Sequence, residues 1–110
     1  MSASEFEAYT TGKTLTFLEN GQAYGAEEYK PGREVIWSFL DGECQEGTWY
    51  AQGKQICFVY EGAEDTPQCW EFYREGSGLR AIFAGEAATE LFEALQSPEP
   101  LVCLGPEIGV

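Results

Sequence analysis

Residues 44–72, CQEGTWYAQGKQICFVYEGAEDTPQCWEF, decide the fold that we expect for this chain. The stretch holds three of the four cysteines and two of the three tryptophans. Two of its runs, 47–51 and 55–60, are rich in aromatic and β-branched residues and meet at a turn marked by Gln52-Gly53. The stretch therefore predicts the centre of a small antiparallel sheet.

The same pattern continues on both sides of this centre. Most of the 13 glycines fall singly between apolar runs, as in Asn20-Gly21 and Asp41-Gly42, which favours tight turns over a flexible linker. Strand patterns recur at residues 14–18, 23–29, 34–40, 68–74 and 79–84. We expect a mainly β fold in one domain, residues 1–110, with an antiparallel meander of seven or eight short strands forming a barrel or strongly curved sheet.

Two helices are expected beside the strands. Ser2 or Ser4 is placed to cap a short N-terminal helix that runs through Phe6 and Tyr9 and stops near Gly12. Near the C-terminus, apolar residues recur at helical spacing, which predicts a helix over residues 86–96 that closes or covers the sheet. The tail, residues 101–110, is short and apolar enough to add an edge strand or to pack under the sheet.

The charge balance excludes several classes of partner. The chain has 19 acidic and 6 basic residues, a formal charge of −13, which disfavours nucleic acid and anionic lipid. No apolar run is long enough to insert into a membrane, and the N-terminus lacks the basic start and apolar middle of a signal peptide. Taken literally, the sequence predicts a cytoplasmic protein; if Met1 is a cloning start, a periplasmic or secreted location is the alternative.

The four cysteines allow three pairings. A loop centred near Ala63 would put Cys57 and Cys69 opposite each other on paired strands, and Cys44 with Cys103 would then remain. Spacing alone does not choose among the pairings, and four reduced, buried thiols are an equal alternative.

Catalytic and metal-binding residues are scarce. With no histidine and no closely spaced cysteine pair, the sequence offers neither a zinc site nor a Ser-His or Cys-His nucleophile, and we expect no cofactor and lean against an enzyme. Clustered acidic residues are the remaining acid–base groups, although solvated turns explain them more simply. They are Glu43 with Glu46, and Glu61 with Glu64 and Asp65.

Aromatic residues are the stronger functional clue. They make up 15% of the chain, more than a core of this size ordinarily needs. A barrel lined by surplus aromatic side chains can hold a small apolar or planar ligand at its mouth, although each ring is individually a candidate for the core. The residues that we predict for such a site are Trp37, Trp49, Tyr50, Tyr60 and Trp70, with Tyr24, Tyr29 and Tyr73 as further tyrosines suited to half-burial.

Two resemblances follow from short motifs. Gly47-Thr48-Trp49 resembles the G-x-W of lipocalin and avidin-like (calycin-type) barrels, in which the tryptophan plugs one end of the barrel, but here three strand patterns precede the motif. The blocks EYKPGREVIW, CQEGTWY, ICFVYE and QCWEF, within residues 28–72, resemble small bacterial domains of unknown function with a G-x-W-Y strand and spaced cysteines. This resemblance implies a compact β fold, with an envelope association in relatives, and supplies no activity.

These observations lead to one hypothesis and two rivals. We expect a non-enzymatic β-barrel-like domain that binds a small apolar or aromatic ligand or a protein partner through its aromatic residues. One rival is a hydrolase or isomerase that uses carboxylates inside the barrel, which predicts a carboxyl group of raised pKa in a pocket. The other is an inhibitor or interaction protein that acts through its acidic surface.

Overall fold

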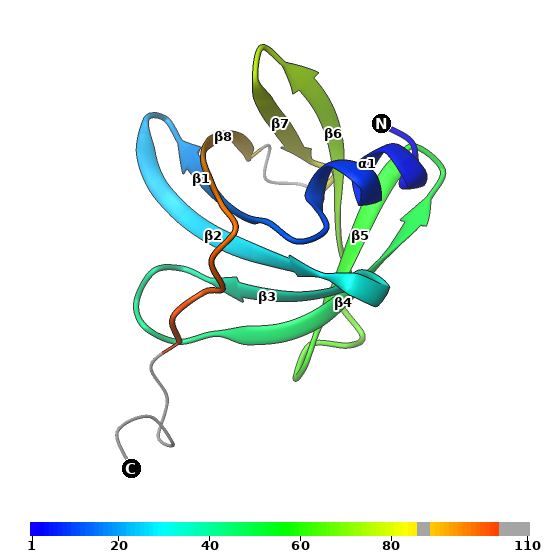
Figure 1. Ribbon diagram of the computed structural model, residues 1–110. Coiled ribbons are helices and arrows are strands. Elements are labelled where there is room, and N and C mark those ends of the chain that lie inside the picture. The colour runs from blue at the N-terminus through cyan, green and yellow to red at the C-terminus, as the bar shows by residue number, and fades with distance from the viewer. Residues whose placement is uncertain (86–88, 104–110) are drawn as a thin grey trace.

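The computed structural model describes residues 1–85 and 89–103 (Figure 1). Within these residues the chain forms one α-helix, α1 (Ala3–Thr10), one 3-10 turn, η1 (Pro31–Arg33), and eight strands. In chain order the strands are β1 (Thr14–Glu19), β2 (Gln22–Lys30), β3 (Glu34–Ser38), β4 (Gln45–Gln52), β5 (Gln55–Tyr60), β6 (Gln68–Glu75), β7 (Gly78–Phe83) and β8 (Glu90–Ser97). No helix in the described ranges is long and apolar enough to cross a membrane.

The strands form a closed antiparallel barrel. Each strand pairs with the next along the chain, and β8 pairs with β1 to complete the ring. Closure gives every strand two neighbours, so no described strand lies at an open edge of the sheet. The prediction of an antiparallel meander that forms a barrel, drawn from turn spacing and alternating side chains, is confirmed.

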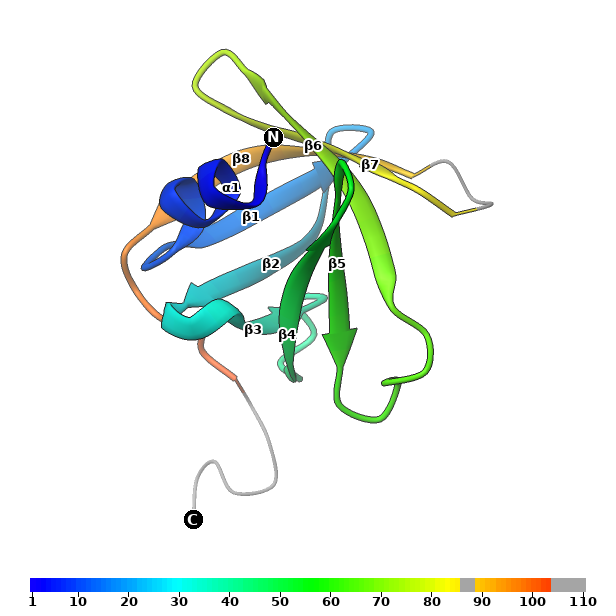
Figure 2. The same cartoon turned by 90° about the vertical axis from the view of Figure 1, so that its right-hand side faces the viewer.

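Antiparallel connections place the turns alternately at two ends of the barrel. At one end, the helix end, lie α1, η1 and the β4–β5 and β6–β7 turns. At the other, the loop end, lie the β1–β2 turn and the loops of residues 39–44 and 61–67. In Figure 2, α1 and η1 lie toward the left, whereas the β5–β6 loop lies toward the right. Different segments of the chain therefore lie at the two ends of the barrel, and different residues close each end or leave it open.

The N-terminal helix forms where the sequence predicts it. Ser2 is the N-cap: its hydroxyl accepts a hydrogen bond from the Glu5 amide, and the Glu5 carboxylate accepts one from the Ser2 amide. This reciprocal pair satisfies two amides that the first turn would otherwise leave without partners. Past the helix, Gly12 adopts φ +86°, a left-handed conformation that glycine adopts without strain.

Phe6 on α1 closes the helix end. Its side chain is fully buried, and its ring lies 5.1 Å from that of Trp49, 4.5 Å from Phe72 and 5.6 Å from Tyr29, centroid to centroid. These separations are those of favourable edge-on and tilted aromatic pairs. The helix thus inserts one aromatic side chain into the barrel and fills that end with packed rings.

The predicted C-terminal helix is wrong. Residues 90–96 belong to β8, and residues 86–88 of the predicted helix lie outside the described residues. In the strand, Leu91 points into the barrel while Phe92 is exposed, so the two residues do not share one face. Pairing on both sides, with β7 and β1, outweighs the helical spacing of the apolar residues because it closes the barrel.

All four cysteines form disulfides. Cys57 and Cys69 face each other on β5 and β6 and are bonded, and Cys44 is bonded to Cys103. Cys57 with Cys69 is the pair that strand positions suggested, and Cys44 with Cys103 is the pair that then remained; the alternative of four reduced thiols is wrong. Each bond joins segments that the sheet or the tail has already brought together, which is the geometry that a disulfide requires.

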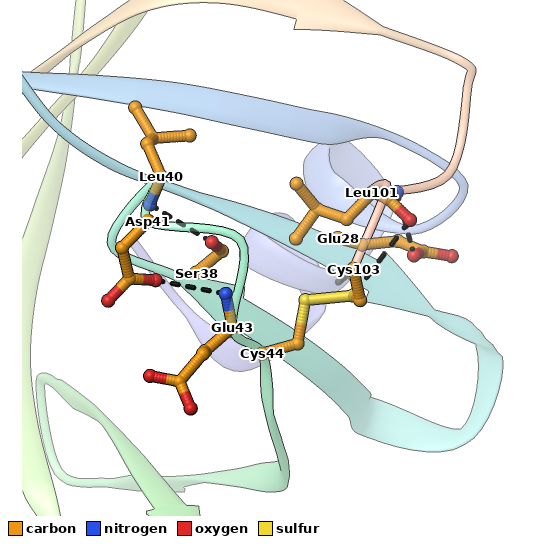
Figure 3. The surroundings of a disulfide bond; sticks show 8 residues. All are labelled: Glu28, Ser38, Leu40, Asp41, Glu43, Cys44, Leu101 and Cys103. Carbon is orange, nitrogen blue, oxygen red and sulfur yellow. Dashed lines mark hydrogen bonds between the residues drawn. A yellow bond between two sulfur atoms is a disulfide. The ribbon is translucent and has the colours of Figure 1, made fainter. Parts of the chain in front are cut away.

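The tail after β8 runs along the outside of the barrel. Thr14 donates its hydroxyl hydrogen bond to the Glu99 carbonyl, and the Leu101 amide donates to the Glu28 carboxylate. The tail then reaches Cys44 in the loop of residues 39–44, where Cys103 forms its disulfide (Figure 3). Residues 101–103 do not form the edge strand named as one option above, and residues 104–110 of that prediction lie outside the described residues.

Candidate functional site

A cavity occupies the loop end of the barrel. Its empty space amounts to about 500 Å³ when the part open to solvent is included, whereas the space in which a water molecule can be centred is about 50 Å³. The walls are largely aromatic and come from β1 to β8. The described residues that line it are Phe17, Tyr24, Glu27, Tyr29, Trp37, Phe39, Gln45, Phe58, Tyr60, Gln68, Trp70, Phe72, Ala81 and Leu91.

The Trp37 ring lies over Gly25 of β2, two residues from its paired residue Glu27. A Cβ atom at Gly25 would lie 2.3 Å from the Trp37 ring and 2.7 Å from the Ser38 carbonyl oxygen, closer than atoms pack. Glycine at this position therefore lets the indole approach the β2 backbone closely. From there Trp37 contacts Tyr24 and Phe39, with ring centroids 5.9 and 5.3 Å apart, and this aromatic trio forms one wall of the mouth.

The rim of the mouth is apolar and exposed. Phe39 is 52% exposed although it lines the cavity. The adjacent Leu40 is half exposed, and its backbone has φ +69°, a left-handed conformation that residues other than glycine seldom adopt. The Leu40 amide donates a hydrogen bond to the Ser38 hydroxyl, which holds this conformation (Figure 3). Backbone strain of this kind concentrates at binding sites, where surrounding contacts sustain it.

A second glycine brings β4 and β5 close together beside the cavity. A Cβ atom at Gly47 would lie 2.4 Å from the Val59 carbonyl oxygen and 2.8 Å from the Tyr60 ring. Its absence lets the Tyr60 ring lie against β4 while its hydroxyl reaches across the barrel to β2. The two glycines thus have the same effect: each lets an aromatic side chain from the neighbouring strand lie close to the backbone.

Glu27 is the one charged side chain among the described residues that line the cavity. It is 3% exposed, and its Oε2 accepts a hydrogen bond of 2.5 Å from the Tyr60 hydroxyl. Burial raises the pKa of Glu27 to about 8, because an apolar environment disfavours the charged form; the hydroxyls of Tyr60 and Tyr29 offset this only in part. A carboxyl group in a cleft whose pKa is raised close to neutral pH is typical of a functional site.

The phenols beside Glu27 remain hydrogen-bond donors. Burial raises the pKa of both Tyr29 and Tyr60 well above the ordinary value, and the nearby Glu27 carboxylate raises them further. Both hydroxyls therefore stay protonated throughout the physiological range. Together the three residues form a polar spot in an otherwise aromatic cavity, able to fix the orientation of a ligand.

The structure separates the predicted site residues into two groups. Trp37, Tyr60 and Trp70 line the cavity together with Tyr24 and Tyr29. Trp49 does not: it packs against Phe6 at the helix end, and the Arg33 guanidinium lies 4.4 Å from its ring centroid.

Two of the predicted tyrosines lie outside the barrel. Tyr50 follows Trp49 on β4 and is 37% exposed, and Tyr73 on β6 is also exposed. The Tyr73 hydroxyl donates a hydrogen bond to Glu71 on the same strand. Neither residue lines the cavity, and the carboxylate groups Glu43 with Glu46 and Glu61 with Glu64 and Asp65 are likewise exposed.

Glu27 is the residue that sequence reasoning missed. It is followed by Glu28, and a Glu-Glu pair gives no sign that one member is buried. The sequence feature that points to a buried Glu27 is the alternation of Gly25, Glu27 and Tyr29. It places Glu27 on the same face of the strand as Tyr29, which is buried.

Comparison with known proteins adds no relative. No family model matches the sequence, and neither the curated proteins nor the solved structures give a significant match. The eight-strand antiparallel barrel is consistent with the barrel that the motif resemblance implied, but it does not identify a lipocalin or avidin-like family; Trp49 of the motif is buried at the helix end. The site must therefore be interpreted from its own geometry.

Proposed function

We propose that this protein is a binding domain that holds a small planar, largely aromatic molecule in the cavity at the loop end of its barrel. The observation that carries the proposal is a mouth lined by aromatic side chains around a single buried carboxyl group. Aromatic walls with a few placed polar groups are the usual composition of small-molecule sites. The helix end supports this interpretation by contrast, since there similar rings pack around Phe6.

The size of the cavity limits the ligand. The space in which a water molecule can be centred, about 50 Å³, holds roughly four water molecules. A single six-membered ring needs somewhat more room, so entry requires outward rotation of a rim side chain. Phe39 is suited to this movement because half of its surface is already exposed and it follows the end of β3. We therefore expect a ligand of about one ring, held end-on between Trp37 and Trp70.

Filling the cavity tests the proposal. Ala81 on β7 lines the cavity and is buried, so Ala81→Leu occupies the space without adding charge. Ala51→Leu makes the same change at an exposed position on β4 and is the matched control. A library of single-ring compounds is titrated against both variants and the wild type by ligand-observed NMR, with circular dichroism to verify folding.

The proposal predicts a clear separation of the variants. Compounds that bind the wild type and Ala51→Leu should lose at least tenfold in affinity for Ala81→Leu. Equal binding by all three proteins would place the ligand outside the cavity. Absence of binding by any compound up to millimolar concentration would contradict a single-ring binding function.

A catalytic alternative has one specific observation in its favour. Glu27 combines a buried position, a pKa of about 8 and two phenols within one cavity, which suits a general acid or base. This is the raised-pKa carboxyl that the carboxylate-enzyme hypothesis predicts, although the described lining supplies one carboxyl and not a pair. Turnover of a bound compound that Glu27→Gln abolishes while binding persists would establish it; binding without turnover favours the binding domain.

A further inference from the structure

We propose that the ligand of this cavity is a cation, a small aromatic amine whose ammonium group pairs with the Glu27 carboxylate. The inference rests on the proposed binding function and names the chemical class that the same cavity selects. Three independent features support it: the charges that face the cavity, the unused capacity of the carboxyl group, and the aromatic faces that have no cation of their own.

The charges that face the cavity favour a positive ligand. Glu27 on β2 is the single ionic side chain of its described lining, and Gln45 and Gln68 at the mouth are neutral. The titratable groups that face Glu27 are the phenols of Tyr29 on β2 and Tyr60 on β5, and Tyr24 lies near Tyr60. None of these groups is cationic, and the whole chain carries a formal charge of −13, so a cation is attracted and an anion is repelled.

The carboxyl group retains acceptor capacity. An ionised carboxylate has two oxygens and about four lone-pair sites. Tyr60 donates to Oε2, and Tyr29 can use at most one further site. An ammonium group presents three N–H donors and no acceptor, so it complements the remaining sites. Such a pair is a charge-assisted hydrogen bond in a site with little water, where the attraction is stronger than in solution.

The aromatic faces are consistent with the same ligand. This protein places its own cations over rings elsewhere: Arg33 over Trp49 at 4.4 Å, and Lys13 and Arg74 over Tyr9 at 4.4 and 4.7 Å. In the described part of the chain no Lys or Arg lies over Trp37 or Trp70. A ligand cation between these rings would gain the same interaction, which strengthens when water is excluded.

A protonated Glu27 that donates to a ligand carbonyl is the competing chemistry. The Tyr60 hydroxyl donates to Oε2 and so favours the ionised, accepting form, whereas burial favours the protonated form. The two chemistries predict opposite pH dependence. An amine must displace the Glu27 proton and binds more tightly as pH rises toward 8, whereas a carbonyl acceptor needs that proton and binds more weakly above pH 8.

The test uses two matched probes, benzylamine and benzyl alcohol, with titration calorimetry between pH 6 and 8.5. The wild type is compared with Glu27→Gln and with Glu46→Gln, which makes the same change at an exposed position on β4. We expect benzylamine to bind the wild type and Glu46→Gln at least tenfold more tightly than benzyl alcohol at pH 8. Its affinity should fall by about tenfold per pH unit below the pKa of Glu27, with release of about one proton on binding.

Each result decides the inference. Glu27→Gln should lose the preference for the amine and keep its affinity for the alcohol. Equal affinity of the wild type for both probes, or an affinity for the amine that falls as pH rises, would overturn the cation while leaving the binding cavity in place. No binding of either probe would overturn the cation, and the library titration described above then decides the binding cavity on its own. The pH dependence of the wild type gives the answer even if the variant fails to fold.

Discussion

The two ends of the barrel are built from the same kinds of residue and differ in what fills them. At the helix end, Phe6 from α1 enters a ring of aromatic side chains and is fully buried. At the loop end no such side chain is inserted among the described residues, and a cavity with a buried carboxyl group remains. The difference shows that aromatic content does not distinguish core from site. What distinguishes them is whether a side chain of the protein itself fills that end of the barrel, as Phe6 fills the helix end.

Removing the Phe6 ring should have the largest effect on stability. Phe6→Ala deletes a fully buried ring with four aromatic neighbours and should lower the free energy of unfolding by about 3–5 kcal/mol. Urea denaturation followed by circular dichroism measures this, with the exposed Tyr73→Ala as a control that should change little. A loss below 1 kcal/mol would show that the helix end is not held by Phe6.

Removing the disulfide between Cys44 and Cys103, at the loop end, should lower the free energy of unfolding by a comparable amount. The bond spans 59 residues, so the chain-entropy relation assigns it about 4 kcal/mol. The double variant Cys44→Ser with Cys103→Ser removes it without leaving a free thiol. The prediction is a lower urea midpoint, with hydrogen exchange accelerated more in residues 39–44 than in α1, because the lost bond also frees this loop in the folded state. Equal loss of protection at both ends would contradict the separation of the two regions.

The buried carboxyl should make stability depend on pH. Below pH 4.5 Glu27 is protonated in both the folded and the unfolded chain; between 4.5 and about 8 only the unfolded chain releases this proton. The free energy of unfolding should therefore fall through this window by about 1.4 kcal/mol per pH unit from this group, and level off above 8. Subtracting the pH profile of Glu27→Gln from that of the wild type isolates the slope. A flat difference would mean that Glu27 is solvated.

The cap of α1 should have the smallest effect. Ser2→Ala removes the hydroxyl that accepts from the Glu5 amide and should cost about 1 kcal/mol. Ser4→Ala lies in the same exposed turn and serves as the control, measured by the same denaturation. If both changes cost the same, capping by Ser2 would not explain where the helix begins.

Most of the fold could be predicted from local patterns. Alternating side chains and glycine-marked turns predict β1 to β7 because strand period and turn conformation are properties of short segments. β8 could not be predicted this way, since Leu91, Phe92 and Leu95 have helical spacing and only the neighbouring strands impose the extended form. The local signal fails where closure of the barrel decides the conformation.

The site could be predicted by residue type but not by position. Trp37, Trp49 and Trp70 are all buried, and their sequences do not reveal which end of the barrel each occupies. That depends on the register of β3, β4 and β6 and on the placement of α1. Glu27 was hidden for a related reason: alternation in β2 places Glu27 and Tyr29 on one face, but only the pairing with β1 and β3 shows that this face turns inward, while the Glu28 carboxylate accepts a hydrogen bond from the tail.

The most direct test of the contrast between the two ends is a two-dimensional NMR titration that follows the three tryptophan indole N–H signals. Single Trp→Phe variants assign the signals, and benzylamine at pH 8 is the titrant. We predict that the Trp37 and Trp70 signals shift together with one dissociation constant while the Trp49 signal stays in place. Shifts at Trp49, or no shift at Trp37 and Trp70 on saturation, would contradict a binding cavity at the loop end.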